Sequence, residues 1–204
     1  MPSETLLDVD EKALLHRYLN EARDALLWKL DGLSEYDVRR PLTPTGTNLL
    51  GLVKHAAGVE LNYFGRVFGR PFPGAPLWST AQALPASDMY ASLDESRESV
   101  VAFYGRVRAY ADETIAALPV DAPGVVPWWS ESRRAVSLRE VLLDVIVELH
   151  RHAGHADVVR ELVDGAVGMQ DGNTNMPEVE ASWWAGHHAR LEEIAAAADP
   201  ALRG

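Results

Sequence analysis

The chain contains 204 residues, of which 47% are hydrophobic and 24% are charged. This composition is typical of a globular protein, and the length is enough for one domain with a sizeable core. The formal net charge of −11 argues against a nucleic-acid partner, because phosphate binding depends on lysine and arginine. We therefore predict one domain over residues 1–204 that does not bind nucleic acid.

The opening sequence, MPSETLLDVDEK, has early acidic residues and lacks the apolar region of a signal peptide. No stretch reaches the roughly 18 consecutive apolar residues that a membrane-spanning helix needs. Both observations predict a cytoplasmic protein without a membrane partner.

The sequence contains no cysteine. Disulfides, thiolate metal ligands and a protein-borne thiol nucleophile are therefore excluded. If the chemistry of this protein involves sulfur, that sulfur has to arrive with a small molecule.

Apolar side chains recur at three- and four-residue spacing through residues 10–31, which is the pattern of an amphipathic helix. Residues 33–46 contain two prolines and a glycine, so we expect a turn there. Thr47 and Asn48 are both suitable N-caps for a second helix, which we expect to continue to about Gly69.

Residues 70–91 form a long segment rich in proline and glycine. Loops of this length in compact domains are often functional. The interpretation we favour is a strap that packs over one edge of the bundle, and substrate contact is the alternative. After this segment, Ser92 and Glu95 match the capping-box pattern and predict the start of a third helix.

A second capping-box pattern, Ser137 with Glu140, predicts a fourth helix that ends at Asp164, just before Gly165. A linker rich in glycine and asparagine leads to a shorter fifth helix at about residues 177–198. We find no alternating strand pattern and no internal repeat. The sequence therefore predicts an all-α four-helix bundle with an additional C-terminal helix and a long loop between helices two and three.

Polar side chains interrupt the apolar faces of the second and fourth helices. His55 has apolar residues three positions before it and four positions after it, so it projects from an apolar stripe. Glu148, His152 and His155 are spaced i, i+4 and i+7, which places them on one face of the fourth helix. We therefore consider these four residues as candidates for a single site.

Burial of two imidazoles and a carboxylate is costly unless they are paired or coordinated. A divalent cation meets this requirement, because imidazole and carboxylate are ordinary ligands of zinc, iron and nickel. A metal-free network of hydrogen bonds between glutamate and histidine meets it as well. The periodicity by itself leaves both alternatives open.

The sequence resembles the DinB and YfiT-like superfamily of metal-binding four-helix bundles in three blocks: LLGLVKHAAGVE, PWWS and SLREVLLDVIVELHRHAGHADVVRELVDG. The similarity is to an actinobacterial branch of unknown function, related to the mycothiol-dependent maleylpyruvate isomerases and to thiol S-transferases. It covers nearly the whole chain, and HAGHADVVRE is its most specific part.

This resemblance implies one metal ligand from the second helix and two from the last bundle helix. The corresponding positions here are His55, Glu148 and His152. His155 falls where many members have a glutamine, so it is either a further ligand or a partner of a ligand. We expect zinc, with nickel, iron and manganese as alternatives. Members of the superfamily often dimerise, which allows a homodimer here.

Two histidines and one carboxylate leave coordination positions open, as in a catalytic metal site. Characterised relatives activate low-molecular-weight thiols at such sites. The resemblance therefore implies a metal-dependent S-transferase or isomerase whose partners are a thiol, with mycothiol as cosubstrate, and an electrophile. Two alternatives stay open: a metal-dependent hydrolase or lyase that activates water, and a non-enzymatic metal-binding stress or scaffold protein.

Overall fold

The computed structural model describes residues 10–199 of the chain. These residues belong to two compact units, of which the first ends at Thr174 and the second begins at Asn175. The single domain predicted from the sequence stays a prediction.

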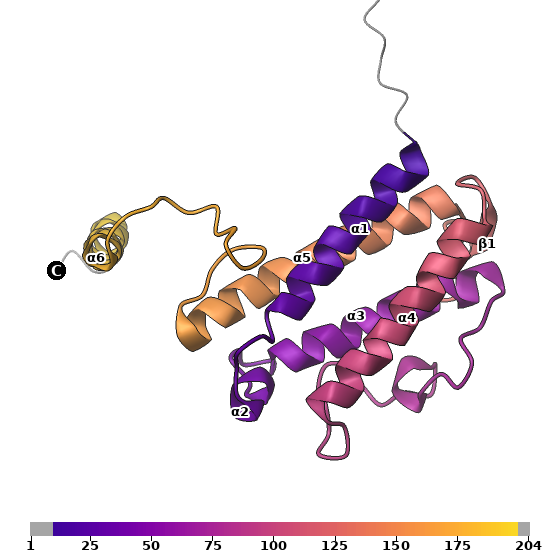
Figure 1. The fold of residues 1–204 in the computed structure, drawn as a ribbon, viewed down its shortest axis with the longest axis horizontal. Coiled ribbons are helices and arrows are strands. Elements are labelled where there is room, and N and C mark those ends of the chain that lie inside the picture. The colour runs from indigo at the N-terminus through magenta and orange to yellow at the C-terminus, as the bar shows by residue number, and fades with distance from the viewer. Residues whose placement is uncertain (1–9, 200–204) are drawn as a thin grey trace, which may run out of the picture. The chain divides into compact units, whose positions relative to one another are not determined.

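The first unit contains four long helices: α1 (Glu11–Trp28), α3 (Leu49–Phe64), α4 (Arg97–Ala117) and α5 (Leu138–Asp164). Helix α1 packs against α5, and α3 packs against both α4 and α5 (Figure 1). All four helices contribute fully buried apolar side chains to one core, for example Leu26, Leu52, Val107 and Val145. The predicted all-α bundle is therefore confirmed. Within residues 10–199, no helix combines the length and apolarity needed to cross a membrane.

Local sequence signals account for several helix ends. The side chain of Asn48 accepts a hydrogen bond from the backbone nitrogen of Gly51 at 2.8 Å and caps α3. Ser137 and Glu140 form the complete capping box at the start of α5. Gly165 ends that helix in the left-handed conformation, with φ of 78°, which glycine adopts without steric cost. The predicted bounds of α5 are thus confirmed at both ends.

The helix start predicted from the Ser92–Glu95 capping-box pattern is wrong. Helix α4 begins at Arg97 after the N-cap Ser96, four residues later than the Ser92–Glu95 pair predicts. The carboxylate of Glu95 does accept a hydrogen bond from the Ser92 backbone nitrogen at 2.9 Å. It also accepts one from Lys54 at 2.8 Å, so the motif closes a turn against α3 and starts no helix.

Five short elements lie between the long helices of the described chain, and none was predicted from the sequence. Helix α2 (Glu35–Arg39) occupies part of the expected turn, and two 3-10 turns, η1 (Arg66–Phe68) and η2 (Leu77–Ser79), follow α3. Strands β1 (Pro123–Val125) and β2 (Ala135–Ser137) pair antiparallel. Strands of three residues are too short to give a recognisable alternating pattern. The hairpin matters because its loop carries Trp128 and Trp129.

In the second unit, α6 spans Ala181–Ala198, which confirms an additional C-terminal helix. It begins four residues after the expected start at Pro177. Glu180, the residue before the helix, still has extended backbone with ψ of 150°. Within α6, the ring of Trp183 stacks on that of His187 with centroids 4.8 Å apart.

Candidate metal centre

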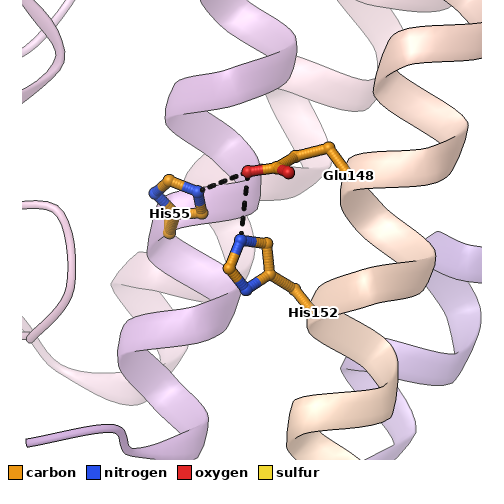
Figure 2. Close-up of side chains that lie close together, drawn as sticks. All are labelled: His55, Glu148 and His152. Atoms are coloured by element: carbon orange, nitrogen blue, oxygen red, sulfur yellow. Dashed lines mark hydrogen bonds and ion pairs between the residues drawn. The ribbon is translucent and has the colours of Figure 1, made fainter.

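Three side chains from two helices converge at the surface between α3 and α5. Their nearest ligand atoms, one each from His55, Glu148 and His152, all lie within 4.8 Å of one another. Oε1 of Glu148 is 3.4 Å from Nε2 of His55 and 3.1 Å from Nε2 of His152 (Figure 2). Glu148 and His152 are one helical turn apart on α5, so their side chains reach the same point.

These distances allow a test of whether the three residues fit a metal ion. Two ligand atoms that each lie about 2.1 Å from a tetrahedral ion are roughly 3.4 Å apart. The Glu148–His55 and Glu148–His152 distances are close to this value. Two imidazoles and a carboxylate are also a common donor set for divalent zinc, iron or nickel. The residues present therefore fit a divalent cation.

The side chains at this centre are partly open to solvent. Relative exposures are 20% for His55, 39% for Glu148 and 13% for His152. A ligand from outside can therefore reach the cluster, which a fully enclosed structural metal site would prevent.

Electrostatics in the cluster favour the protonation states that metal binding requires. Burial raises the pKa of Glu148, but the charge of His152 and hydrogen bonds from His55 and His152 outweigh it, and the net pKa is lowered. Burial, followed by the charge of His55, lowers the pKa of His152 despite the opposing effect of Glu148. An ionised carboxylate and a neutral imidazole are the forms that coordinate a cation.

Asp88 contacts His55 on the side away from Glu148. Its Oδ2 lies 2.7 Å from Nδ1 of His55, whereas Nε2 of the same ring faces Glu148. We did not identify Asp88 from the sequence, because it lies in the long loop, 33 residues from His55, and belongs to no helical spacing pattern.

His155 lies beside the cluster rather than in it. The group of converging ligand atoms found among the described residues does not include it. Its Nδ1 is 3.3 Å from Nδ1 of His152, on the opposite edge of that ring from Nε2. A role as a partner of His152 fits this position, and direct ligation by His155 stays a prediction.

A cleft of about 490 Å³ opens beside the centre and includes His55 and Asp88 in its lining. One face of α3 lines it, because His55, Val59 and Asn62 follow one another at helical spacing. Trp78 from the α3–α4 loop (residues 65–96) and Trp128 from the hairpin loop also line it.

Aromatic side chains shape the part of the cleft near Arg66. The ring of Trp128 packs edge-on against Tyr63 with centroids 5.2 Å apart, and the Arg66 guanidinium lies 5.7 Å from the Trp128 ring centroid. Burial, with the charges of Asp144 and Glu148, raises the pKa of Tyr63 although contacts with the indole groups oppose it. Its hydroxyl therefore stays protonated at neutral pH and is available as a hydrogen-bond donor.

A comparison with protein-family models finds a match to the mycothiol-S-transferase family over residues 14–165. The match spans more than half of the chain and includes the three converging residues, Asp88 and the residues that line the cleft. No curated protein matches the chain. The resemblance inferred from the sequence is thus confirmed, and the chain belongs to the mycothiol-S-transferase family of DinB-like helical bundles.

Proposed function

We propose that this protein is a metal-dependent S-transferase that joins the sulfur of mycothiol to a small electrophile. The observation that carries the proposal is the convergence of His55, Glu148 and His152 at the edge of an open cleft. Membership of the mycothiol-S-transferase family supports the choice of thiol. The lack of cysteine supports it as well, because the nucleophile then has to come from a cosubstrate.

In the proposed reaction, the thiol S–H bond breaks and a bond forms between sulfur and an electrophilic carbon. The leaving group departs with its electron pair, and the thiol proton passes to solvent. A bound divalent cation would lower the pKa of a coordinating thiol, which makes sulfur nucleophilic at neutral pH. We expect zinc, with nickel, iron and manganese as alternatives.

The residues of the chain have separate roles in this proposal. His55, Glu148 and His152 hold the cation, and the partial exposure of the cluster leaves room for the thiol. Trp78 and Trp128 bound the cleft in which the substrates lie. Tyr63, whose pKa is raised, donates a hydrogen bond to a substrate atom that gains negative charge.

The direct test follows thiol conjugation with purified protein, mycothiol and monochlorobimane. The zinc-loaded protein should form the bimane conjugate faster than the uncatalysed reaction, and removal of the metal with EDTA should abolish this rate. His152→Ala should abolish it as well. His150→Ala is a suitable control, because His150 lies on the same helix but outside the cluster.

Other outcomes would contradict the proposal. A rate unchanged by EDTA or by His152→Ala would exclude the metal site as the source of activity. A zinc-loaded protein that forms no conjugate with a panel of electrophiles, but hydrolyses esters or amides in a manner that depends on His152, would favour the hydrolase alternative.

A further inference from the structure

Asp88 reaches His55 from a loop that other residues hold firmly against α3. Its Oδ2 lies 2.7 Å from His55 Nδ1, and the two side chains are 32% and 20% exposed. A carboxylate on this nitrogen favours the proton on Nδ1, so that the Nε2 lone pair would be available to a cation bound at the cluster.

The backbone carbonyls of the two residues after Asp88 each accept a hydrogen bond from a side chain. The Asn48 side-chain nitrogen donates to the Met89 carbonyl at 3.1 Å, and Lys54 donates to the Tyr90 carbonyl at 2.9 Å. Lys54 itself is only 3% exposed. The N-cap residue of α3 and one residue within that helix therefore fix the position of the loop directly after Asp88.

A third residue, Arg39 of α2, also donates hydrogen bonds to the backbone of this loop. The Arg39 guanidinium donates to the carbonyl oxygens of Ala91, Ser92 and Glu95 at 3.1, 3.2 and 2.7 Å. Each residue of segment 88–92 is thus hydrogen-bonded to a polar side chain of α2, of α3 or of the N-cap of α3. Segments with few such contacts open most easily, so these hydrogen bonds hold segment 88–92 in a defined position.

Backbone geometry also indicates that surrounding contacts hold this loop in place. Ala86 has φ of 57°, a left-handed conformation that is unfavourable for alanine and persists only where surrounding contacts enforce it. The loop also passes so close to α3 that a Cβ at Gly51 would collide with the Met89 carbonyl oxygen. The positive φ of Ala86 carries local strain, whereas glycine at position 51 lets the loop approach α3 closely without it.

We propose that Asp88 is a positioning residue that fixes the His55 imidazole for metal binding and couples segment 88–92 to metal occupancy. This inference rests on the metal site of the proposed function. Carboxylates that orient a histidine ligand typically increase metal affinity 10- to 100-fold. Because linkage is reciprocal, a cation that gains affinity from the Asp88–His55 contact also stabilises that contact and the segment that carries Asp88.

The coupling reaches the wall of the cleft as well. Asp88 and Trp78 belong to the same α3–α4 loop, and both line the cleft. Metal occupancy therefore orders a segment connected to the surface that the substrates contact.

The first experiment measures zinc dissociation constants by competition with a chromophoric chelator. Asp88→Ala should weaken zinc binding 10- to 100-fold, and Asp88→Asn, which keeps an oxygen acceptor, should weaken it less. Asp94→Asn is the matched control, because Asp94 is an exposed carboxylate of the same loop and its loss changes the net charge equally. Circular dichroism of each metal-free variant checks that the fold is retained.

Two further readouts separate positioning from a general structural role. In zinc-loaded protein, a slowly exchanging Nδ1–H signal of His55 should appear in ¹H–¹⁵N spectra and vanish in Asp88→Ala. Hydrogen exchange of amides 88–92 should slow on zinc addition in the unaltered protein, and this slowing should be lost in Asp88→Ala.

The outcomes distinguish this inference from the proposed function. If the unaltered protein binds no zinc, nickel, iron or manganese, both are overturned. If it binds zinc tightly but Asp88→Ala binds within twofold of the same affinity, only the role of Asp88 is overturned. A zinc-dependent slowing of amides 88–92 that persists in Asp88→Ala also contradicts the coupling.

Discussion

Arg23 of α1 and Glu60 of α3 form an ion pair in which both side chains are fully buried. Nε of Arg23 lies 3.0 Å from each carboxylate oxygen of Glu60, and the Tyr104 hydroxyl from α4 donates to the same carboxylate at 2.8 Å. Burial and the charge of Glu60 raise the pKa of Tyr104 well above its usual value, so the phenol remains a donor. The network joins three helices of the bundle inside its core.

Glu60→Gln should therefore destabilise the fold by about 3 kcal/mol, because it leaves the buried Arg23 guanidinium without its carboxylate. Asp112, which also accepts from Arg23 at 2.7 Å, keeps the cost from being larger. The free energy of unfolding from urea denaturation measures the effect. Glu21→Gln, which breaks the exposed Arg17–Glu21 pair, is the control and should cost less than about 0.5 kcal/mol. Equal costs for the two substitutions would contradict a structural role for the buried pair.

Metal content of single variants should distinguish the three converging residues from His155, which contacts one of them. His55→Ala and His152→Ala should each lose bound metal, since two remaining ligands hold a cation weakly. His155→Ala should retain about one ion per chain with reduced affinity, because His155 contacts the far edge of the His152 ring. Elemental analysis of protein purified without a histidine tag gives both the metal identity and the stoichiometry. Complete loss of metal in His155→Ala would instead assign His155 as a ligand.

Trp128 should contribute to substrate binding without contributing to metal binding. Its half-exposed indole lines the cleft, where an aromatic face provides a large contact area. Trp128→Ala should raise KM about tenfold and leave kcat and zinc content nearly unchanged, since the lost contact serves bound substrate and transition state alike. The control is Tyr36→Ala, which removes an exposed aromatic side chain of α2 outside the cleft lining and should change none of these. A fall in kcat with unchanged KM would place Trp128 in the chemical step.

Stability at low pH should depend on Glu95. Burial raises the pKa of Glu95, but hydrogen bonds from Lys54 and Ser92 outweigh it and lower the pKa below the usual 4.5. The ionised carboxylate therefore stabilises the folded state above pH 4.5, and this contribution is lost as the pH falls through the lowered value. Glu95→Gln should be less stable than the unaltered protein at pH 7, and the difference should shrink as the pH falls below 4.5.

Urea denaturation at several pH values measures this difference. In a Lys54→Met background, which removes the partner cation, the effect of Glu95→Gln should become much smaller. A difference that is the same at pH 7 and at pH 3.5 would contradict the assigned role of the carboxylate.

Features of the bundle that depend on local sequence could be predicted closely. Helix α5 begins after Ser137 and ends before Gly165 as predicted, because capping and helix termination are decided within a few residues. Helical periodicity also predicted that Glu148 and His152 share one face of α5 and that His55 projects from the core side of α3. Their approach to within 4.8 Å follows from the packing of those two faces.

Other features depend on contacts between segments that are far apart in the sequence. The Ser92–Glu95 pair matches a helix start, but Lys54 of α3 draws the Glu95 carboxylate into a turn. The contact of Asp88 with His55 depends on where the 32-residue connection between α3 and α4 crosses α3. No helical spacing pattern in the sequence predicts that path.

The sequence by itself thus determined the long helices, their inward faces and the polar side chains that interrupt those faces, since these depend on spacing along one chain segment. Only the tertiary structure decided which carboxylate contacts Nδ1 of His55 and where the cleft opens, because both depend on contacts between residues far apart in the chain.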